Sequence, residues 1–399
     1  MVKPSAKPCT GFLWDDCFAN HSTGSLLPGV EHFETAATKY GFFQLLATSG
    51  LLKDLVRFTA PVPAPDEALL SVHTPEYIAL LQGLDATGGD AGEEAPFAAG
   101  GYAIAKRAVG GILAMTDAIL EGRIKNGYAL VRPPGHHAER DRGRGFCLLA
   151  NVAIAVKHIQ AKVPGARVAV VDYDVHAGNS TTSIFYDDPS VLVISIHQDR
   201  AYPYDSNHIT ENGSGPGVGY TINIPLPAGS GSGAYADAFD RVIVPALNRF
   251  APDFIFVSSG FDASFMDPLG CMALGSHDFR GFVERIMAVA RVHCQDRVLC
   301  CHEGGYSTAY VPFCGLEVMK QLSGIEVATD DPFAWEVKGM PAQALTIDQA
   351  VVVSKAARLV KNVEDCGRVS EPSETYGLPK RFLSACLLSM RAAIQAFVI

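Results

Sequence analysis

The 399-residue sequence lacks several features that identify broad classes of protein. Its ten cysteines form no C-x-x-C pair, and Cys300 and Cys301 lie in an apolar run, which predicts free thiols rather than disulfides. The amino-terminal MVKPSAKPCTGFLW has no apolar signal core, and no apolar run is long enough to span a bilayer. A basic excess is also absent, since the net charge of −10 argues against a nucleic-acid-binding protein. These absences predict a reduced, cytoplasmic protein that binds neither nucleic acid nor membrane.

The composition that remains is that of a globular protein rich in shaped loops. The chain is 48% hydrophobic and 19% charged, with 38 Gly and 24 Pro. Its length suits a large α/β enzyme that folds as one unit. Neither an internal repeat nor a convincing linker occurs before about residue 363. We therefore predict one catalytic domain over residues 1–362 and a C-terminal extension over 363–399, in which 380–399 forms a helix of unknown role.

Short apolar runs alternate with longer helical patterns along the chain. The strand-like runs are 128–132, 167–175, 191–196, 220–226, 253–260 and 297–305. The helix-like segments are 100–122, 147–162, 233–251, 276–295 and 345–362. Nearly continuous Val and Ile runs separated by helices predict a parallel sheet that is covered on both faces.

Polar motifs follow four of these runs. RPPGHHAE follows the first, DVHAGNS the second, GFDASFMDP the fifth and HEGGY the sixth. Ligands of open parallel sheets bind beyond the carboxyl ends of the strands. We therefore expect these motifs to meet at one edge of the sheet.

The stretch VVDYDVHAGNS indicates a cation site. Asp172, Asp174 and His176 occupy alternate positions, which would place them on one side of a strand, where the two carboxylates repel each other unless a cation lies between them. With Asp262, the pair Asp174 and His176 supplies three ligands and leaves an open position, as a hydrolytic metal site requires. Each Asp by itself is more often a cap or turn residue.

His136, His137 and Tyr306 are the candidate catalytic groups. Two neighbouring histidines can divide acid and base roles near neutral pH. Tyr306 follows two glycines that allow a sharp turn, and its hydroxyl can donate to an oxyanion. Taken alone, a His-His pair is more often a surface loop, and a Tyr after Gly-Gly more often packs.

RPPGHHAE, GFCLLANVAIA, VDYDVHAGN, SSGFDAS and EGGY together resemble the histone deacetylase and acetylpolyamine amidohydrolase family, above all its bacterial class II-like histone deacetylase-like amidohydrolases. The likeness covers roughly residues 10 to 330. It implies an arginase-like α/β fold with a central eight-stranded, mostly parallel sheet between helices. It also implies a deacylase that uses Zn²⁺, or Fe²⁺, to hydrolyse acyl-lysine or a small N-acylated amine.

The resemblance assigns a role to individual residues. It makes Asp174, His176 and Asp262 the zinc ligands, and His136, His137 and Tyr306 the catalytic groups. It implies that Asp172 and Asn179 orient the two histidines. It implies a structural K⁺ at Asp172, Asp174, His176, Ser195 and Ile196. The substrate channel would be lined by Gly145, Phe146, Tyr202 and Leu269, with Asp90, Glu93 and Glu94 in the loop at its rim. The segment HSTGSLLPGVEH would contact a neighbouring subunit in a homodimer or homotetramer.

Several positions depart from the family pattern. Ala177 replaces a second His, Ser180 a Gly and Ala150 an Asn, and residues 31–41 lack the usual His-Pro-Glu and an Arg near the site's internal cavity. Together they leave the acyl-chain and leaving-group preference open.

Two other readings of the motifs stay open. An arginase or agmatinase would use a second Asp where this chain has Gly178, although Asp267 is suggestive of those enzymes. A catalytically silent module that binds acylated lysine is the alternative from a different functional class.

Overall fold

A computed structural model describes residues 9–27 and 30–365 of the chain. Its main sheet has eight strands in the order β12-β11-β10-β13-β14-β8-β1-β4, and all seven pairs of neighbours are parallel. The strands are β1 Cys9–Leu13, β4 Val56–Phe58, β8 Ile124–Ala129, β10 Val168–Asp172, β11 Val191–Gln198, β12 Thr221–Leu226, β13 Phe254–Ser259 and β14 Val298–His302. The predicted eight-stranded parallel sheet is confirmed.

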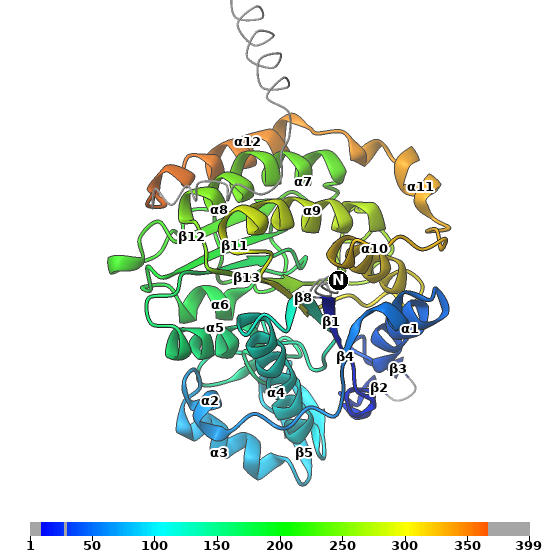
Figure 1. Ribbon diagram of the computed structural model, residues 1–399, viewed down its shortest axis with the longest axis vertical. Helices are drawn as coiled ribbons and strands as arrows, with labels where there is room; N and C mark the ends of the chain where they lie inside the picture. The colour runs from blue at the N-terminus through cyan, green and yellow to red at the C-terminus, as the bar shows by residue number, and fades with distance from the viewer. Residues whose placement is uncertain (1–8, 28–29, 366–399) are drawn as a thin grey trace, which may run out of the picture. The chain divides into compact units, whose positions relative to one another are not determined.

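Helices flank this sheet on both faces. The helices of the described residues are α1 Ala36–Thr48, α2 Asp66–Leu70, α3 Pro75–Leu84, α4 Gly101–Leu120, α5 Asn151–Lys162, α6 Asn179–Ile184, α7 Ser232–Ala238, α8 Val244–Phe250, α9 Ser276–His293, α10 Val311–Ser323, α11 Ala334–Gly339 and α12 Ile347–Ala357. Figure 1 shows α7 to α10 and α12 on one side of the strands and α4 to α6 on the other. Since both faces are covered, the central strands are apolar along nearly their whole length.

Three short strand pairs lie outside the main sheet. They are β2 Ser25–Leu27 with β3 Val30–Glu31, β5 Gly88–Asp90 with β7 Pro96–Ala98, and β6 Gly92–Glu93 with β9 Gly143–Arg144. The last pair joins the loop of residues 88–98 to the segment that follows the tandem histidines. It therefore brings the predicted rim loop next to the predicted channel.

Burial explains why the central strands form. All residues of β10, β13 and β14 are buried, so these strands make the core between the two helical layers. Cys300 and Cys301 lie in β14 and are free thiols, as predicted. The other described cysteine side chains are also free.

Some elements differ from the sequence prediction. Strand β10 ends at Asp172, so Asp174 and His176 lie in the loop beyond it rather than on one side of a continuous strand. Segment 233–251 contains a π-helical turn, Phe239–Ile243, between α7 and α8. Strands β1 and β4 were not predicted, because β1 begins Cys-Thr-Gly and β4 has only three residues. Helices α1, α2, α3, α6, α10 and α11 were also missed.

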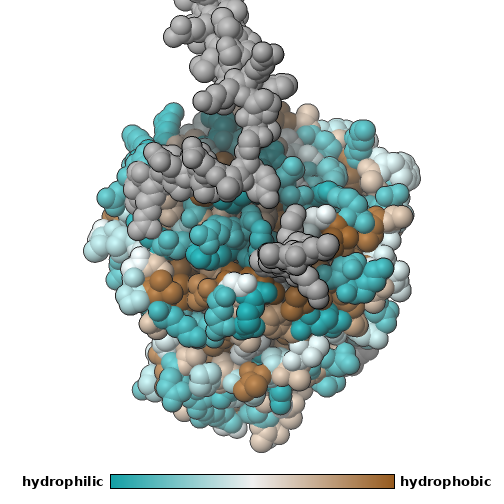
Figure 2. Space-filling model, viewed as in Figure 1, coloured by the Kyte–Doolittle hydropathy of each residue, from teal (hydrophilic) through white to brown (hydrophobic). Residues whose placement is uncertain are grey.

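The face of the molecule in Figure 2 is mostly hydrophilic, with smaller hydrophobic areas between the polar ones. Trp335 and Ile347 are the most exposed large apolar side chains near α11 and α12. No helix in the described ranges is long and apolar enough to cross a membrane. The predicted helix at 380–399 lies outside the described residues, so the division at residue 362 stays a prediction.

Candidate active site

Four neighbouring strands deliver the candidate site residues. In the sheet order β10, β13, β14 and β8 are adjacent, and all are parallel. The loops after their carboxyl ends carry the four polar motifs, at one edge of the sheet. The predicted convergence therefore follows from strand order.

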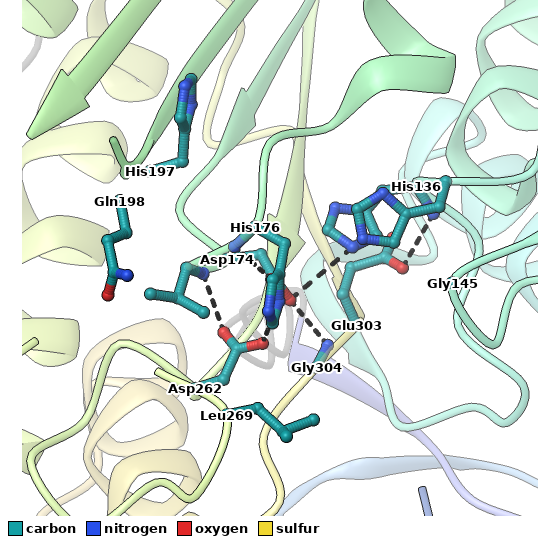
Figure 3. A network of polar contacts seen from close by, with 12 residues as sticks. His136, Gly145, Asp174, His176, His197, Gln198, Asp262, Leu269, Glu303 and Gly304 are labelled. Atoms are coloured by element: carbon teal, nitrogen blue, oxygen red, sulfur yellow. Dashed lines mark hydrogen bonds and ion pairs between the residues drawn. The ribbon is translucent and has the colours of Figure 1, made fainter. Parts of the chain in front are cut away.

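Asp174, His176 and Asp262 form a compact group with geometry suited to a metal ion. Ligand atoms from the three side chains all lie within 4.8 Å of one another, and no other such group of three or more occurs among the described residues. Nδ1 of His176 is 3.1 Å from Oδ1 of Asp174 and 3.1 Å from Oδ2 of Asp262. Figure 3 shows the His176 ring beside both carboxylates.

Backbone groups hold the two carboxylates in place. The N–H of Gly304 donates to Oδ2 of Asp174 at 2.8 Å, and the N–H of Val175 donates to Oδ1 of Asp262 at 2.8 Å. A Cβ atom on Gly304 would overlap both carboxylates, so only glycine lets the chain pass this close. Gly305 then turns with φ of 121°, a conformation that L side chains rarely adopt.

The charges of this group also fit a bound cation. Asp174 and Asp262 are completely buried, and burial together with the charge of Asp174 raises the pKa of Asp262 to about 8. Burial opposes protonation of His176, but hydrogen bonds to both carboxylates raise its pKa to about 10. Because the two buried carboxylates repel each other, the group needs positive charge, which protons on His176 and Asp262 supply when no cation is bound. A divalent ion with an open coordination position meets that need.

The tandem histidines have different partners. Nδ1 of His136 lies 3.0 Å from Oδ2 of Asp172, and Nδ1 of His137 lies 2.6 Å from Oδ1 of Asn179. Burial by itself would lower the pKa of His136, yet the charges of Asp174 and Asp172 raise that pKa well above its usual value. Burial lowers the pKa of His137 well below that value, and the charge of His136 adds to the effect. The two rings therefore have opposite protonation preferences.

Glu303 holds the loop that carries these histidines. Its Oε2 accepts the N–H of Gly135 at 2.7 Å and that of His136 at 3.1 Å. Figure 3 shows the contact between Glu303 and His136. Burial raises the pKa of Glu303 to about 7, while the nearby charge of His136 lowers it. The sequence offered no signal for this role beyond its place in HEGGY.

Asp267 positions Tyr306 through the backbone. Its carboxylate accepts the N–H of Tyr306 at 2.7 Å and the N–H of Leu269 at 2.9 Å. Burial raises the pKa of Asp267 to about 6. Asp267 therefore organises the loop and does not belong to the group of candidate metal ligands, and Gly178 has no side chain that could act as a ligand. This geometry does not favour the arginase alternative.

A cavity of about 340 Å³ opens onto this group. Its lining includes His137, His176 and Tyr306 at the reactive end, and the predicted channel residues Gly145, Phe146, Tyr202 and Leu269. The Phe146 ring stands edge-on to Tyr306, with ring centroids 6.0 Å apart. The Tyr202 ring stands edge-on to His137 at 5.0 Å. Aromatic walls of this kind suit a thin aliphatic chain.

The three rim acids differ in their contacts. Asp90 accepts the N–H of Gly92 at 2.9 Å and so shapes its own loop. Glu93 lies 3.1 Å from Arg144 in an ion pair. Glu94 lines the cavity, is exposed and has no ion pair in the described structure. Glu94 is therefore the acid best placed to meet a substrate.

The residues predicted to surround K⁺ lie together around the end of β10. Asp172 pairs in register with Ser195 of β11, and Ile196 follows it along that strand. The N–H of Asp174 donates to Oδ1 of Asp172 at 3.1 Å. A Cβ on Gly178 would overlap the Asp172 carboxylate, which explains a glycine at this point.

Comparisons with known proteins agree with this geometry. The Histone deacetylase domain model matches residues 32–322. The chain is 45% identical over 336 residues to a histone deacetylase-like amidohydrolase from Pseudomonas aeruginosa, covering 81% of this chain and 88% of the relative. The chain belongs to the histone deacetylase family. It is also 35% identical to a probable deacetylase from Archaeoglobus fulgidus, over 80% of this chain and 88% of that one.

The solved structures include another member of the histone deacetylase family. The crystal structure of the HDA15 HD domain superposes with a TM-score of 0.80 at 27% identity, covering 98% of this chain and 99% of that one. The family resemblance and the fold predicted from the sequence are thus both confirmed.

Within this member of the histone deacetylase family, Glu34 and Lys39 of segment 31–41 form a charged cluster with Arg132 that the sequence did not reveal. Glu34 accepts two hydrogen bonds from Arg132, at 2.8 and 2.6 Å, and Lys39 lies 3.1 Å from the same carboxylate. All three side chains are completely buried. The Lys39 ammonium also lies 5.6 Å from the centre of the Tyr306 ring. A buried lysine thus supplies a positive charge beside Tyr306.

The other departures from the family pattern have local consequences. Ala177 lines a second cavity of about 370 Å³, which shares Gln198 and Tyr204 with the lining of the first. The N–H of Ala150, at the start of α5, donates to Nε2 of His73 at 3.0 Å. Ser180 is completely buried in α6. Neither Ala150 nor Ser180 contacts the metal-binding group.

Proposed function

We propose that the chain is a zinc-dependent deacylase that hydrolyses the N-acyl amide of acyl-lysine or of a small acylated amine. The observation that carries this proposal is the meeting of three kinds of group at the end of one narrow cavity. These are the metal-binding group of Asp174, His176 and Asp262, the tandem histidines, and the Tyr306 phenol. The names of the relatives support the same reaction class.

Each group then has a chemical role. A zinc ion held by the three ligands, when bound, polarises the amide carbonyl and makes water more acidic. His137, neutral because its pKa is lowered, takes the proton of the attacking water at Nε2. Tyr306 donates a hydrogen bond to the oxyanion. His136, or His137 once protonated, gives a proton to the leaving amine.

The channel residues would orient the substrate before reaction. Phe146 and Tyr202 would enclose the aliphatic chain on two sides, and Leu269 would close a third. The carbonyl of Gly145 would accept the N–H of the scissile amide. Gly145 and Phe146 both have positive φ, 49° and 70°, a backbone conformation that is uncommon for residues other than glycine.

A panel of amides tests the reaction and its dependence on metal. The full-length protein is assayed on acetyl-lysine and longer acyl-lysine peptides, acetylpolyamines and acetanilides, with and without a chelator. We expect hydrolysis of at least one class, loss of that hydrolysis with the chelator, and its return with added Zn²⁺. Hydrolysis that is insensitive to the chelator would contradict the metal mechanism.

Glu94 is expected to select substrates that carry a second positive charge. Glu94→Gln should lower kcat/KM for a substrate with a distal ammonium by about 2–5-fold, the range of an exposed ion pair. A neutral acyl-lysine peptide should show no change, and the difference should shrink at high salt. Glu76→Gln, an exposed charge on α3, is the matched control. Equal losses for both substrates would mean that Glu94 only supports the loop.

The alternative is a silent module that binds acylated lysine without hydrolysing it. Wild-type protein that binds zinc and an acyl-lysine probe but turns over no amide would favour it.

The proposal has three further parts. They are a homo-oligomer, a cytoplasmic location and a structural K⁺ site formed by Asp172, Asp174, His176, Ser195 and Ile196. Light scattering that shows a monomer would remove the oligomer.

A further inference from the structure

Glu139 hydrogen-bonds Asn179, the partner of His137, and is neither a lining residue of the cavity nor a member of the metal-binding group. We propose that Glu139 is a positioning residue that selects the tautomer of His137 by fixing the side-chain amide of Asn179. This inference rests on the proposed function, in which His137 is the base. It adds a residue to which neither the family motifs nor the pattern of metal ligands gave a role.

The amide of Asn179 can face His137 in two ways. With Oδ1 toward the ring, it accepts a hydrogen from Nδ1, and Nε2 stays free to take a proton. With the NH₂ group toward the ring, Nδ1 must accept, and Nε2 then carries the hydrogen and cannot act as a base. The two states differ only by a half-turn of the amide, so the favoured orientation depends on the group that contacts the side of the amide facing away from His137.

The other side of that amide meets Glu139. Nδ2 of Asn179 lies 3.1 Å from Oε1 of Glu139, while Oδ1 lies 2.6 Å from Nδ1 of His137. A carboxylate only accepts hydrogen bonds, so the turned amide would set two acceptor oxygens against each other. Among the described residues, no side chain other than His137 and Glu139 hydrogen-bonds the Asn179 amide. Glu139 therefore determines which way the amide faces His137.

Two arginines hold Glu139 in this position. Arg144 donates from Nη1 to Oε1 at 2.9 Å, and Arg142 donates from Nε to Oε2 at 2.9 Å. The Arg144 side chain is 6% exposed and also pairs with Asp205 at 3.0 Å. The carboxylate therefore has a fixed direction toward Asn179, and Asp205 provides a contact to Arg144 that does not involve the amide.

The tautomer can be measured without a substrate. In protein labelled with ¹⁵N-histidine, the His137 resonances, assigned with His137→Gln, should show a protonated Nδ1 and an unprotonated Nε2. Glu139→Ala should give a mixture of the two tautomers, whereas Asp205→Asn should keep the wild-type pattern. An unchanged tautomer in Glu139→Ala would overturn the inference.

A double-mutant cycle then tests the consequence for catalysis. Glu139→Ala should lower kcat by about 10–100-fold, the order found for groups that orient a functional histidine, with little change in KM. In an Asn179→Asp background, the same substitution should cost nothing or restore activity, because both faces of a carboxylate accept. Equal losses in both backgrounds would show that Glu139 acts by another route.

The two experiments separate this inference from the proposed function. If the wild type hydrolyses no amide, the proposed function fails, and the tautomer of His137 still decides the role of Glu139. If the wild type is active but Glu139→Ala lowers kcat equally in the wild-type and Asn179→Asp backgrounds, the proposed function is supported and the inference about Glu139 is wrong.

Discussion

Tyr306→Phe is expected to lower kcat by about 10²–10³-fold, the loss found when one oxyanion donor is removed. Burial raises the pKa of the Tyr306 phenol well above its usual value, and the charges of Asp262 and Asp174 add to that effect. The hydroxyl is therefore protonated at neutral pH and can donate. Phenylalanine keeps the ring beside Phe146 and under the Lys39 ammonium, so only the donor is lost.

The measurement is kcat on the best amide of the panel, together with zinc content and melting temperature. We expect zinc content to match the wild type, because Tyr306 is not in the metal-binding group. Tyr235→Phe is the matched control, since Tyr235 is fully buried and its hydroxyl makes no hydrogen bond within the part of the chain that the structure describes. The charges of Asp262 and Asp174 add to the effect of burial in raising its pKa, as they do for Tyr306. A variant Tyr306→Phe with wild-type kcat would exclude the oxyanion role.

Glu34→Ala is expected to lower the free energy of unfolding by about 3–5 kcal/mol, as when one partner of a buried ion pair is removed. Arg132 and Lys39 would remain completely buried without a carboxylate. Arg132 also donates to the carbonyls of Phe18 and His21 at 2.8 and 3.0 Å. The cluster thus joins the amino-terminal segment to the loop that carries the tandem histidines, and its loss affects both.

Urea denaturation of the two proteins checks this value, with Glu121→Ala as the control. Glu121 pairs with Arg123 at the surface, where both side chains are more than half exposed, so its loss should cost under about 1 kcal/mol. If Glu34→Ala loses no more free energy of unfolding than Glu121→Ala, the Glu34 carboxylate does not stabilise the buried charges of Arg132 and Lys39.

The stability that Glu34 contributes should also depend on pH. Burial opposes ionisation, but the charges of Arg132 and Lys39 lower the pKa of Glu34 far below its usual 4.5. The contribution is therefore complete above pH 4.5 and is lost as the pH falls toward the lower folded-state pKa. The gap between wild type and Glu34→Ala should be constant near neutrality and narrow in acid.

The sequence by itself determined the sheet and the reactive groups. The run 253–260 contains the unbroken apolar stretch Phe254–Val257 because both faces of a parallel strand are buried, and this holds wherever the strand lies in the sheet. The motifs RPPGHHAE, DVHAGNS and HEGGY contain the histidines, carboxylates and tyrosine of the candidate site, so the kinds of reactive group could be predicted from the sequence. Strands with polar starts, such as β1, escaped prediction because neighbouring strands rather than their own pattern stabilise them.

Only the tertiary structure decided which residues meet. Asp174 and His176 were predicted on one side of a strand, yet they lie in a loop, and they converge because β10 and β13 are neighbours. The sequence also gave no sign that Arg132 pairs with Glu34, which is 98 residues away, or that Glu139 hydrogen-bonds Asn179 of another motif. A sequence shows which side chains a protein has, but hydrogen bonds and ion pairs depend on distances of a few ångströms, which packing alone sets.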